Sequence, residues 1–484
     1  MTQSLVDPLM LQRRAFLRAT TAAAAAIALP SWGCARREVR TVAPMLAELD
    51  PNAPWWLQQN FGPVVEERDV ASLAVRGAIP PELDGVYVRN GSNAQNGQST
   101  HWFLGDGMIH GVRLSGGNAR WYKNRYVRTP WYESKTQLGA PGGPNTQANV
   151  SLVHHGGRLL ASGEVGFPYA IDPSDLSTVG FHDFDGRLDT SFTAHPAIDP
   201  QTGAMHFFGY GFEEPFVTYH VADRAGALVH SEAVDARAPT MMHSFAITDR
   251  DVVFWELPVV FDLDEFDRSG WFFRWDSGLG ARIGVMPLGG PASALRWVDV
   301  EPCYVYHAAN AFREGDDVVV DVCRYREMMN GERFGSVPTT LVRWRVGTGG
   351  DELTFSETML SDRSFEFPYT DRRFAGRPNR YSWYTTFRSN PAILNPAGVA
   401  RYDAKTGKLD EWEPGPARQS GEPLFVDAGG TEGEGWLLTY VYDAERRSSD
   451  LAVFDATAVR KGPVAEVLMP NRVPHGFHGA WVPA

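Results

Sequence analysis

Four of the thirteen histidines stand in similar contexts, each flanked by apolar or small residues: His195, His243, His307 and His478. Imidazole binds zinc, copper, iron and nickel, so four converging histidines would make a metal site without selecting its ion. A closed tetrahedral zinc site has no free position, whereas an octahedral ion such as Fe(II) with four imidazoles keeps two positions open for dioxygen or substrate. The four histidines therefore indicate metal chemistry.

The intervals between these histidines indicate a repeating architecture. His195 and His243 are 48 residues apart, the next interval is 64 residues, and His478 follows His307 by 171 residues. With propeller blades of about 60 residues, these intervals correspond to one, one and three blades, and inward-pointing histidines at one level of a propeller converge on its axis. A single histidine on an apolar strand is more often a core residue than a ligand, but four at such intervals favour a common site.

The elements that would position them are strands. From about residue 71 onward, β-branched and aromatic runs alternate with Gly, Asp, Asn and Pro, as at residues 85–89, 251–255 and 317–322. Such runs predict strands. After the N-terminal leader, no convincing amphipathic pattern of about 12 residues or more occurs, which disfavours parallel α/β folds. Recurrent Asp-Pro and Asp-Ala-Lys-Thr-Gly turns are typical of propeller hairpins, so we expect an all-β chain forming a single β-propeller.

Several longer motifs resemble those of the carotenoid cleavage oxygenases, and the resemblance covers nearly all of the chain after the leader. The motifs are residues 89–93 (RNGSN), 101–111 (HWFLGDGMIHG), 124–129 (NRYVRT), 301–307 (EPCYVYH) and 476–479 (GFHG). The resemblance implies a seven-bladed propeller with Fe(II) on its axis, held by His195, His243, His307 and His478. It also implies a cap of loops and short helices over the axial metal site, which forms an apolar substrate tunnel.

The resemblance further implies three carboxylates behind the metal ligands. A metal-bound imidazole usually donates its second N–H to an acceptor that fixes the tautomer and the ring plane. The positions that match the family's three glutamates are Glu164, Glu366 and Glu422. From the residues alone, a glutamate between apolar neighbours is equally a surface residue at a strand edge. Which glutamate pairs with which histidine stays open.

The reaction implied by the resemblance adds dioxygen across a conjugated C=C bond of a carotenoid or apocarotenoid and yields two carbonyl products. Stilbene-cleaving members have a Lys just before the glutamate that matches Glu164, and Gly163 stands there in this chain. The departure favours a polyene, although Tyr126 could contact a polar end group of a substrate. Two alternatives come from other classes: a non-catalytic polyene-binding propeller, and a zinc or calcium hydrolase, for which no set of carboxylates stands out.

Other histidines compete with the proposed ligands. His475 lies three residues before His478, and residues three apart on a strand point to opposite faces, so only one of the two can face a metal. The family pattern places the ligand directly before Gly479. His101 and His110 flank a Gly-Asp-Gly turn, and we expect both to be structural.

The first 35 residues are predicted to form a targeting segment, and residues 36–484 the propeller domain. Arg13 and Arg14 precede an Ala-rich apolar stretch over residues 19–29. This pattern is typical of a twin-arginine signal and is short for a membrane span. We therefore expect export to the periplasm. Cys34 is either a lipid-attachment site or an incidental cysteine near the cleavage point.

Composition excludes one class of partner. The formal net charge is −13, and no basic stripe follows the leader, which argues against a nucleic-acid ligand. We expect a monomer whose partners are dioxygen and an apolar polyene, with a peripheral membrane contact as an open alternative. Cys303 and Cys323 are too few for a disulfide framework and are expected to be buried and inert.

Overall fold

The computed structural model describes residues 49–50, 52–134, 142–328, 338–388 and 394–484. These residues belong to one compact unit, Pro44–Ala484. The expected signal features, Arg13, Arg14 and Cys34, lie outside the described residues. Among the helices of the described part, none has the length and apolar character needed to cross a bilayer.

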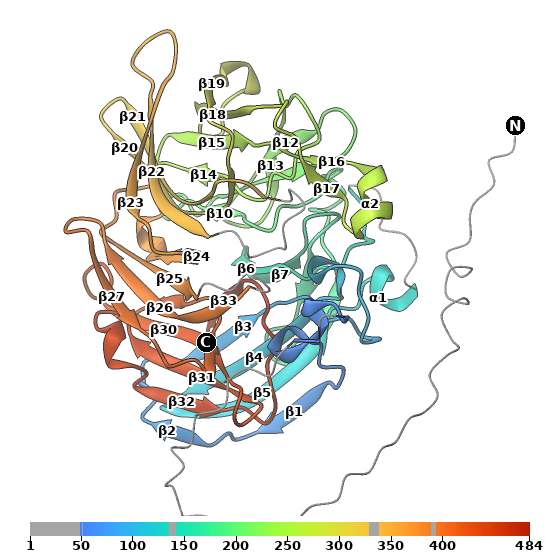
Figure 1. The fold of residues 1–484 in the computed structure, drawn as a ribbon, viewed down its shortest axis with the longest axis vertical. Coiled ribbons are helices and arrows are strands. Elements are labelled where there is room, and N and C mark those ends of the chain that lie inside the picture. Colours follow the sequence, from blue (N-terminus) through green and yellow to red (C-terminus); the bar gives the residue numbers. More distant parts are fainter. Residues whose placement is uncertain (1–48, 51, 135–141, 329–337, 389–393) are drawn as a thin grey trace, which may run out of the picture. The chain divides into compact units, whose positions relative to one another are not determined.

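Seven antiparallel sheets surround a central axis as the blades of a β-propeller, which confirms the expected all-β fold (Figure 1). Five blades are each formed by consecutive segments of the chain. Their strands are β6–β9 (Ser151–His155, Arg158–Ser162, Tyr169–Ile171, Thr178–Phe181), β10–β13 (Ala197–Ile198, Met205–Tyr210, Val217–Ala222, Leu228–Val234), β14, β15, β18 and β19 (Ala246–Ile247, Asp251–Glu256, Ala281–Pro287, Arg296–Val300), β20–β23 (Tyr304–Glu314, Asp317–Tyr325, Thr339–Gly347, Thr354–Ser361) and β24–β27 (Phe365–Thr370, Tyr381–Phe387, Pro396–Asp403, Lys408–Trp412).

The other two blades combine strands from both ends of the propeller. One contains β1 (Arg68–Ala71), β3 (Gly85–Arg89), β4 (Met108–Ser115), β5 (Asn118–Tyr126) and β33 (Gly479–Pro483), and the other contains β2 (Val75–Gly77), β28 (Arg418–Ser420), β29 (Leu424–Asp427), β30 (Gly435–Asp443), β31 (Ser448–Asp455) and β32 (Ala465–Leu468). The last strand, β33, pairs with β3, and β2 pairs with β32. Backbone hydrogen bonds therefore close the ring and hold the segment that carries His478.

The core lies between the blades, because each central strand is covered on both faces. Strand β15 shows this, since Val252, Val253, Phe254 and Trp255 are all at most 1% exposed. Alternation of polar and apolar residues is lost in such strands, which explains the continuous apolar runs in the sequence. Trp255 also meets Trp344 of the next blade edge-on, with ring centroids 6.0 Å apart.

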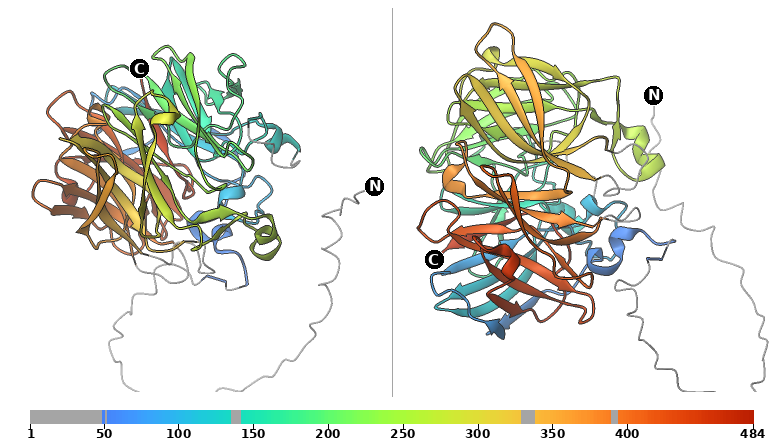
Figure 2. Two further views of the ribbon diagram at one scale, coloured as in Figure 1. Left: turned by 90° about the horizontal axis from the view of Figure 1, so that it is seen from above. Right: turned by 60° about the vertical axis from the view of Figure 1, so that its left-hand side comes forward.

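Helical segments are short and lie in the connections. The described residues contain α1 (Pro130–Ser134), α2 (Leu263–Ser269) and the 3₁₀ turns η2 (Trp55–Leu57), η3 (Gln59–Phe61), η4 (Trp102–Leu104), η5 (Ala292–Ala294), η6 (Arg372–Phe374) and η7 (Val459–Lys461). Helix α2 begins after Asp262, whose side chain accepts the backbone N–H of Asp264, and ends at Gly270, where φ is 76°. It is flanked by the hairpin of β16 (Val259–Phe261) and β17 (Phe273–Trp275). Figure 2 shows α2 and the first 3₁₀ turns projecting on the same side of the propeller.

Candidate metal centre

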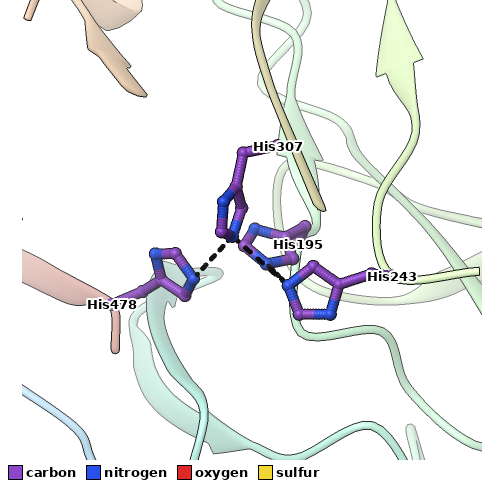
Figure 3. Close-up of side chains that lie close together, drawn as sticks. All are labelled: His195, His243, His307 and His478. Carbon is purple, nitrogen blue, oxygen red and sulfur yellow. Dashed lines mark hydrogen bonds between the residues drawn. The ribbon is translucent and has the colours of Figure 1, made fainter. Parts of the chain in front are cut away.

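The side chains of His195, His243, His307 and His478 converge on one point (Figure 3). Their Nε2 atoms are 2.9 Å apart for His195 and His243, 3.3 Å for His243 and His307, and 3.2 Å for His307 and His478. Two ligand atoms each about 2.1 Å from one ion, at a right angle, lie about 3 Å apart. The four nitrogens are therefore spaced as neighbouring ligands of a single metal ion.

Each histidine is placed where the chain enters an innermost strand. His195 precedes β10, His243 precedes β14, and His478 comes directly before β33. His307 lies within β20, at a register shift between Val305 and Ala308. The intervals of 48, 64 and 171 residues correspond to one, one and three blades of the observed topology.

Three of the four imidazoles are backed by a carboxylate. Nδ1 of His243 donates to Glu164, Nδ1 of His307 lies 2.5 Å from Glu366, and Nδ1 of His478 lies 2.7 Å from Glu422. The structure therefore shows which glutamate pairs with which histidine, a point that the sequence left open. Among the described residues, no carboxylate contacts the ring of His195.

The three carboxylates are held by further donors. Tyr210 donates its hydroxyl to Glu164 Oε2 over 2.6 Å, and the backbone N–H of Gly479 donates to Glu422 over 2.8 Å. Burial favours the neutral form of Glu164, but His243 and the hydrogen bonds from His243 and Tyr210 outweigh it and lower its pKa. Burial dominates at Glu366 and raises its pKa to about 7, against the opposing N–H of Phe367.

This arrangement fits a metal ion. A carboxylate that accepts a hydrogen bond from Nδ1–H fixes the tautomer in which Nε2 carries a lone pair. Burial, followed by the neighbouring histidines, lowers the pKa of His195 and of His307 well below the usual value, so both rings are neutral. Lone pairs aimed at one point repel unless a cation lies between them. The neutral donors suit a divalent transition-metal ion.

Aromatic side chains surround one side of the four histidines. The ring of Phe367 lies 5.5 Å from that of His307 and 5.4 Å from that of His478, and Tyr306 meets His243 edge-on at 5.0 Å. Other aromatic residues extend this wall: Trp55, Trp56, Phe61, Trp102, Phe103 and Phe477. A flat apolar ligand could lie against such a surface, whereas acid or base groups are few there.

The competing histidines lie outside the cluster. His475 bonds to Gln419 Oε1 at 3.1 Å, and His110 pairs with the Tyr122 hydroxyl at 2.9 Å. The strand argument for excluding His475 was wrong in its premise, because residues 475–478 form no strand. His101 caps η4 by accepting the N–H of Phe103.

Two further expectations concerned single side chains. Tyr126, considered as a possible contact of a substrate's polar end group, has a buried hydroxyl that is bonded to Asn93 and to the carbonyl of Val64. Cys303 and Cys323 are buried free thiols, as expected, and burial raises the pKa of Cys303 to about 11.

Sequence reasoning missed two side chains near the metal centre. Tyr210 supports Glu164 from β11, and Arg372 of η6 is near enough to influence the pKa of His195. Neither carries a sequence signal, because each stands far from any ligand motif and reaches the centre only through the packing of blades.

Comparison with known proteins places the chain in a family. Residues 61–483 match the family model described as retinal pigment epithelial membrane protein. A carotenoid cleavage oxygenase from Mycobacterium tuberculosis is 35% identical, over 88% of this chain and 97% of that protein. An isoeugenol monooxygenase from Pseudomonas nitroreducens is 30% identical, over 90% and 100%. The crystal structure of a lignostilbene dioxygenase from Pseudomonas brassicacearum superposes with a TM-score of 0.81 at 28% identity, covering 90% of this chain and 100% of that one. The chain therefore belongs to the carotenoid cleavage oxygenase family, in which retinal pigment epithelial membrane protein is grouped, and is an oxygenase of that family.

Proposed function

We propose that this protein is an Fe(II)-dependent dioxygenase that cleaves one conjugated C=C bond of a carotenoid or apocarotenoid to two carbonyl products. The observation that carries the proposal is the convergence of four imidazoles, three of them backed by glutamates, beside a wall of aromatic rings. Fe(II) with four nitrogen ligands keeps positions open for a reactant, as a closed zinc site does not.

The ion would activate dioxygen, and the protein's own residues have separate roles. His195, His243, His307 and His478 would hold the metal, while Glu164, Glu366 and Glu422 keep three of the rings in one tautomer and orientation. The aromatic wall would hold a flat polyene by apolar contact and keep water away from the reacting carbons. No proton transfer is needed when one dioxygen molecule supplies both carbonyl oxygens, which agrees with the small number of acid and base groups among the described residues of this surface.

The proposed substrate class is argued from the relatives and from the residue that precedes Glu164. The relatives include proteins named carotenoid cleavage oxygenase, isoeugenol monooxygenase and lignostilbene dioxygenase, and the last two names refer to phenolic compounds. Gly163 stands where stilbene-cleaving members have Lys, and a Cβ at this position would lie 3.0 Å from Thr146 Oγ1. This chain therefore lacks a cation that could pair with a phenol at that position, which favours an apolar polyene.

Product analysis tests the proposal. Protein loaded with iron under anaerobic conditions is mixed with a panel of carotenoids, apocarotenals, stilbenes and isoeugenol, and products are identified by mass spectrometry under ¹⁸O₂. The expected result is two carbonyl fragments from a polyene, both labelled. Turnover of the phenolic compounds alone would select the phenolic alternative. Binding of the polyene without cleavage would contradict the dioxygenase and support a binding propeller.

We also propose export by the twin-arginine route, a periplasmic location and a monomeric state. Support for export comes from the Arg13-Arg14 pair and the apolar stretch that follows it. Replacing both arginines by Lys should retain the protein in the cytoplasmic fraction. Mass spectrometry of the mature protein would decide between lipid attachment at Cys34 and simple cleavage, sedimentation would give the oligomeric state, and flotation with liposomes would test a peripheral membrane contact.

A further inference from the structure

A cavity of about 630 Å³ runs along the propeller axis from the metal centre. Its walls are the innermost strands, as they continue beyond the ligands: residues 195–198, 244–247, 307–311, 368–373, 425–427 and 478–481 contribute to its lining. Pro483 and Asp427 at its rim are exposed, so the cavity reaches solvent. The aromatic residues Phe103, Phe367 and Phe477 do not line it. The metal centre therefore has an axial side that is separate from its apolar side.

Most charged groups that line this axial cavity already have partners. Glu422 is bonded to His478 at 2.7 Å. Arg373 pairs with Asp371 at 2.6 Å and with Asp427 at 3.0 Å. Arg372 differs, because within the described residues no carboxylate lies within salt-bridge distance of its guanidinium. Its positive charge faces the cavity without compensation.

The guanidinium of Arg372 is held in place by a tyrosine. Its Nε donates to the Tyr369 hydroxyl over 3.1 Å, and its central carbon lies 4.8 Å from the centre of the Tyr369 ring. Arg372 is exposed, and it lines the same cavity as His195 and Glu422. The hydrogen bond to Tyr369 uses Nε, and within the described residues the two terminal amino groups of Arg372, a residue that lines the cavity, make no hydrogen bond.

We propose that Arg372 makes the axial cavity a binding site for a small carboxylate. A guanidinium with two free amino groups matches the geometry of a carboxylate, with two parallel N–H···O hydrogen bonds. Small neutral residues, Ala197, Ala308 and Ala309, are part of the cavity's lining, and the lining carboxylates Asp371, Asp427 and Glu422 are already bonded to Arg373 or to His478. The volume accommodates acetate or a several-carbon acid.

Occupation of this site would change the charge beside the metal centre. The electrostatic influence of Arg372 extends to the centre, since its pKa is raised by Tyr369 and then by Glu422, the carboxylate that is bonded to His478. A bound carboxylate would cancel that positive charge at the axial side while the aromatic side stays free for an apolar substrate. The cavity would thus link a water-soluble anion to the metal centre.

Acetate is a suitable probe because its methyl protons report binding directly by saturation-transfer NMR. We expect a signal from wild-type protein with acetate that formate displaces, and none with the neutral analogue acetamide. The Arg372→Gln variant should weaken acetate binding by about tenfold or more, and Arg372→Lys should retain part of it. Arg250→Gln is the matched control. Arg250 lies beside Asp249, which bonds to Gly376 just after η6, but it is exposed and outside the cavity.

Metal-free and iron-loaded protein must both be measured. Binding at Arg372 persists without iron, whereas a signal seen only with iron would mean that acetate binds the metal, and this would overturn the proposal. Equal acetate binding by wild type and Arg372→Gln would also overturn it, as would equal signals from acetate and acetamide in wild type, which needs no variant to fold. The test uses no polyene and no turnover, so its outcome is independent of the proposed dioxygenase function.

Discussion

Replacement of Glu422 by Gln should weaken iron binding while the fold is kept. Glu422 accepts two buried hydrogen bonds, from His478 Nδ1 at 2.7 Å and from the Gly479 backbone N–H at 2.8 Å. A glutamine amide has one oxygen, so its NH₂ group must face one of these two donors. The loss of the negative charge adds to this mismatch. Loss of such a carboxylate partner typically reduces metal affinity by 10–100-fold. Because both hydrogen bonds are affected, we expect the iron affinity to fall about 100-fold, which is a loss of about 2.7 kcal/mol in binding free energy.

The assay is anaerobic competition between the protein and a ferrous chelator, with circular dichroism and thermal unfolding of the metal-free protein as checks of the fold. Glu445→Gln is the matched control, because Glu445 is exposed in the turn between β30 and β31. Its iron affinity should equal that of wild type. If folded Glu422→Gln protein bound iron within about twofold of wild type, the carboxylate would not orient the ligand, and the reasoning would be refuted.

Three further predictions concern a histidine outside the metal centre, a second buried histidine and the hydrophobic core. His475→Gln should keep stoichiometric iron, whereas His478→Ala should lose it. The reverse result in an iron analysis would mean that His475, and not His478, is the metal ligand. Burial lowers the pKa of His206 to about 4. Below pH 6.5 the unfolded chain therefore binds a proton that the folded protein does not, and the free energy of unfolding falls as the pH drops from 6.5 toward 4. The loss is about 2 kcal/mol by pH 5. His206→Gln should therefore lose less stability than wild type between pH 7 and pH 5 in urea unfolding, and an equal loss would be inconsistent with a neutral histidine. Trp383→Ala removes a fully buried side chain and should cost about 3–5 kcal/mol in the same experiment; a loss below about 1 kcal/mol would contradict close packing.

Much of the centre was predictable because its ligands occupy equivalent places in a repeat. His195, His243 and His307 each enter an inner strand of successive blades, so their intervals along the chain carry spatial information. The strands themselves were predictable from their apolar runs, since blades cover both faces of a central strand. The family motifs added the three glutamates.

Features made by packing between distant segments were not predictable. Tyr210 meets Glu164 across 46 residues, and nothing in either local sequence marks the contact. The strand geometry invoked to allow only one of His475 and His478 at the metal does not apply, because the chain there is irregular, and the ring of His475 is held by Gln419. Asp371 and Asp427 both pair with Arg373 and not with its neighbour Arg372, and the local sequence gives no sign of which arginine they would choose.

X-ray absorption at the iron K-edge tests the central claim most directly, because it reports the ligands of the bound metal without assuming any substrate. Anaerobically loaded protein should show about four imidazole nitrogens at about 2.1 Å, and His307→Ala should lose stoichiometric iron. A first shell dominated by carboxylate oxygens, or iron retained in full by the His307→Ala variant, would contradict a centre built from His195, His243, His307 and His478.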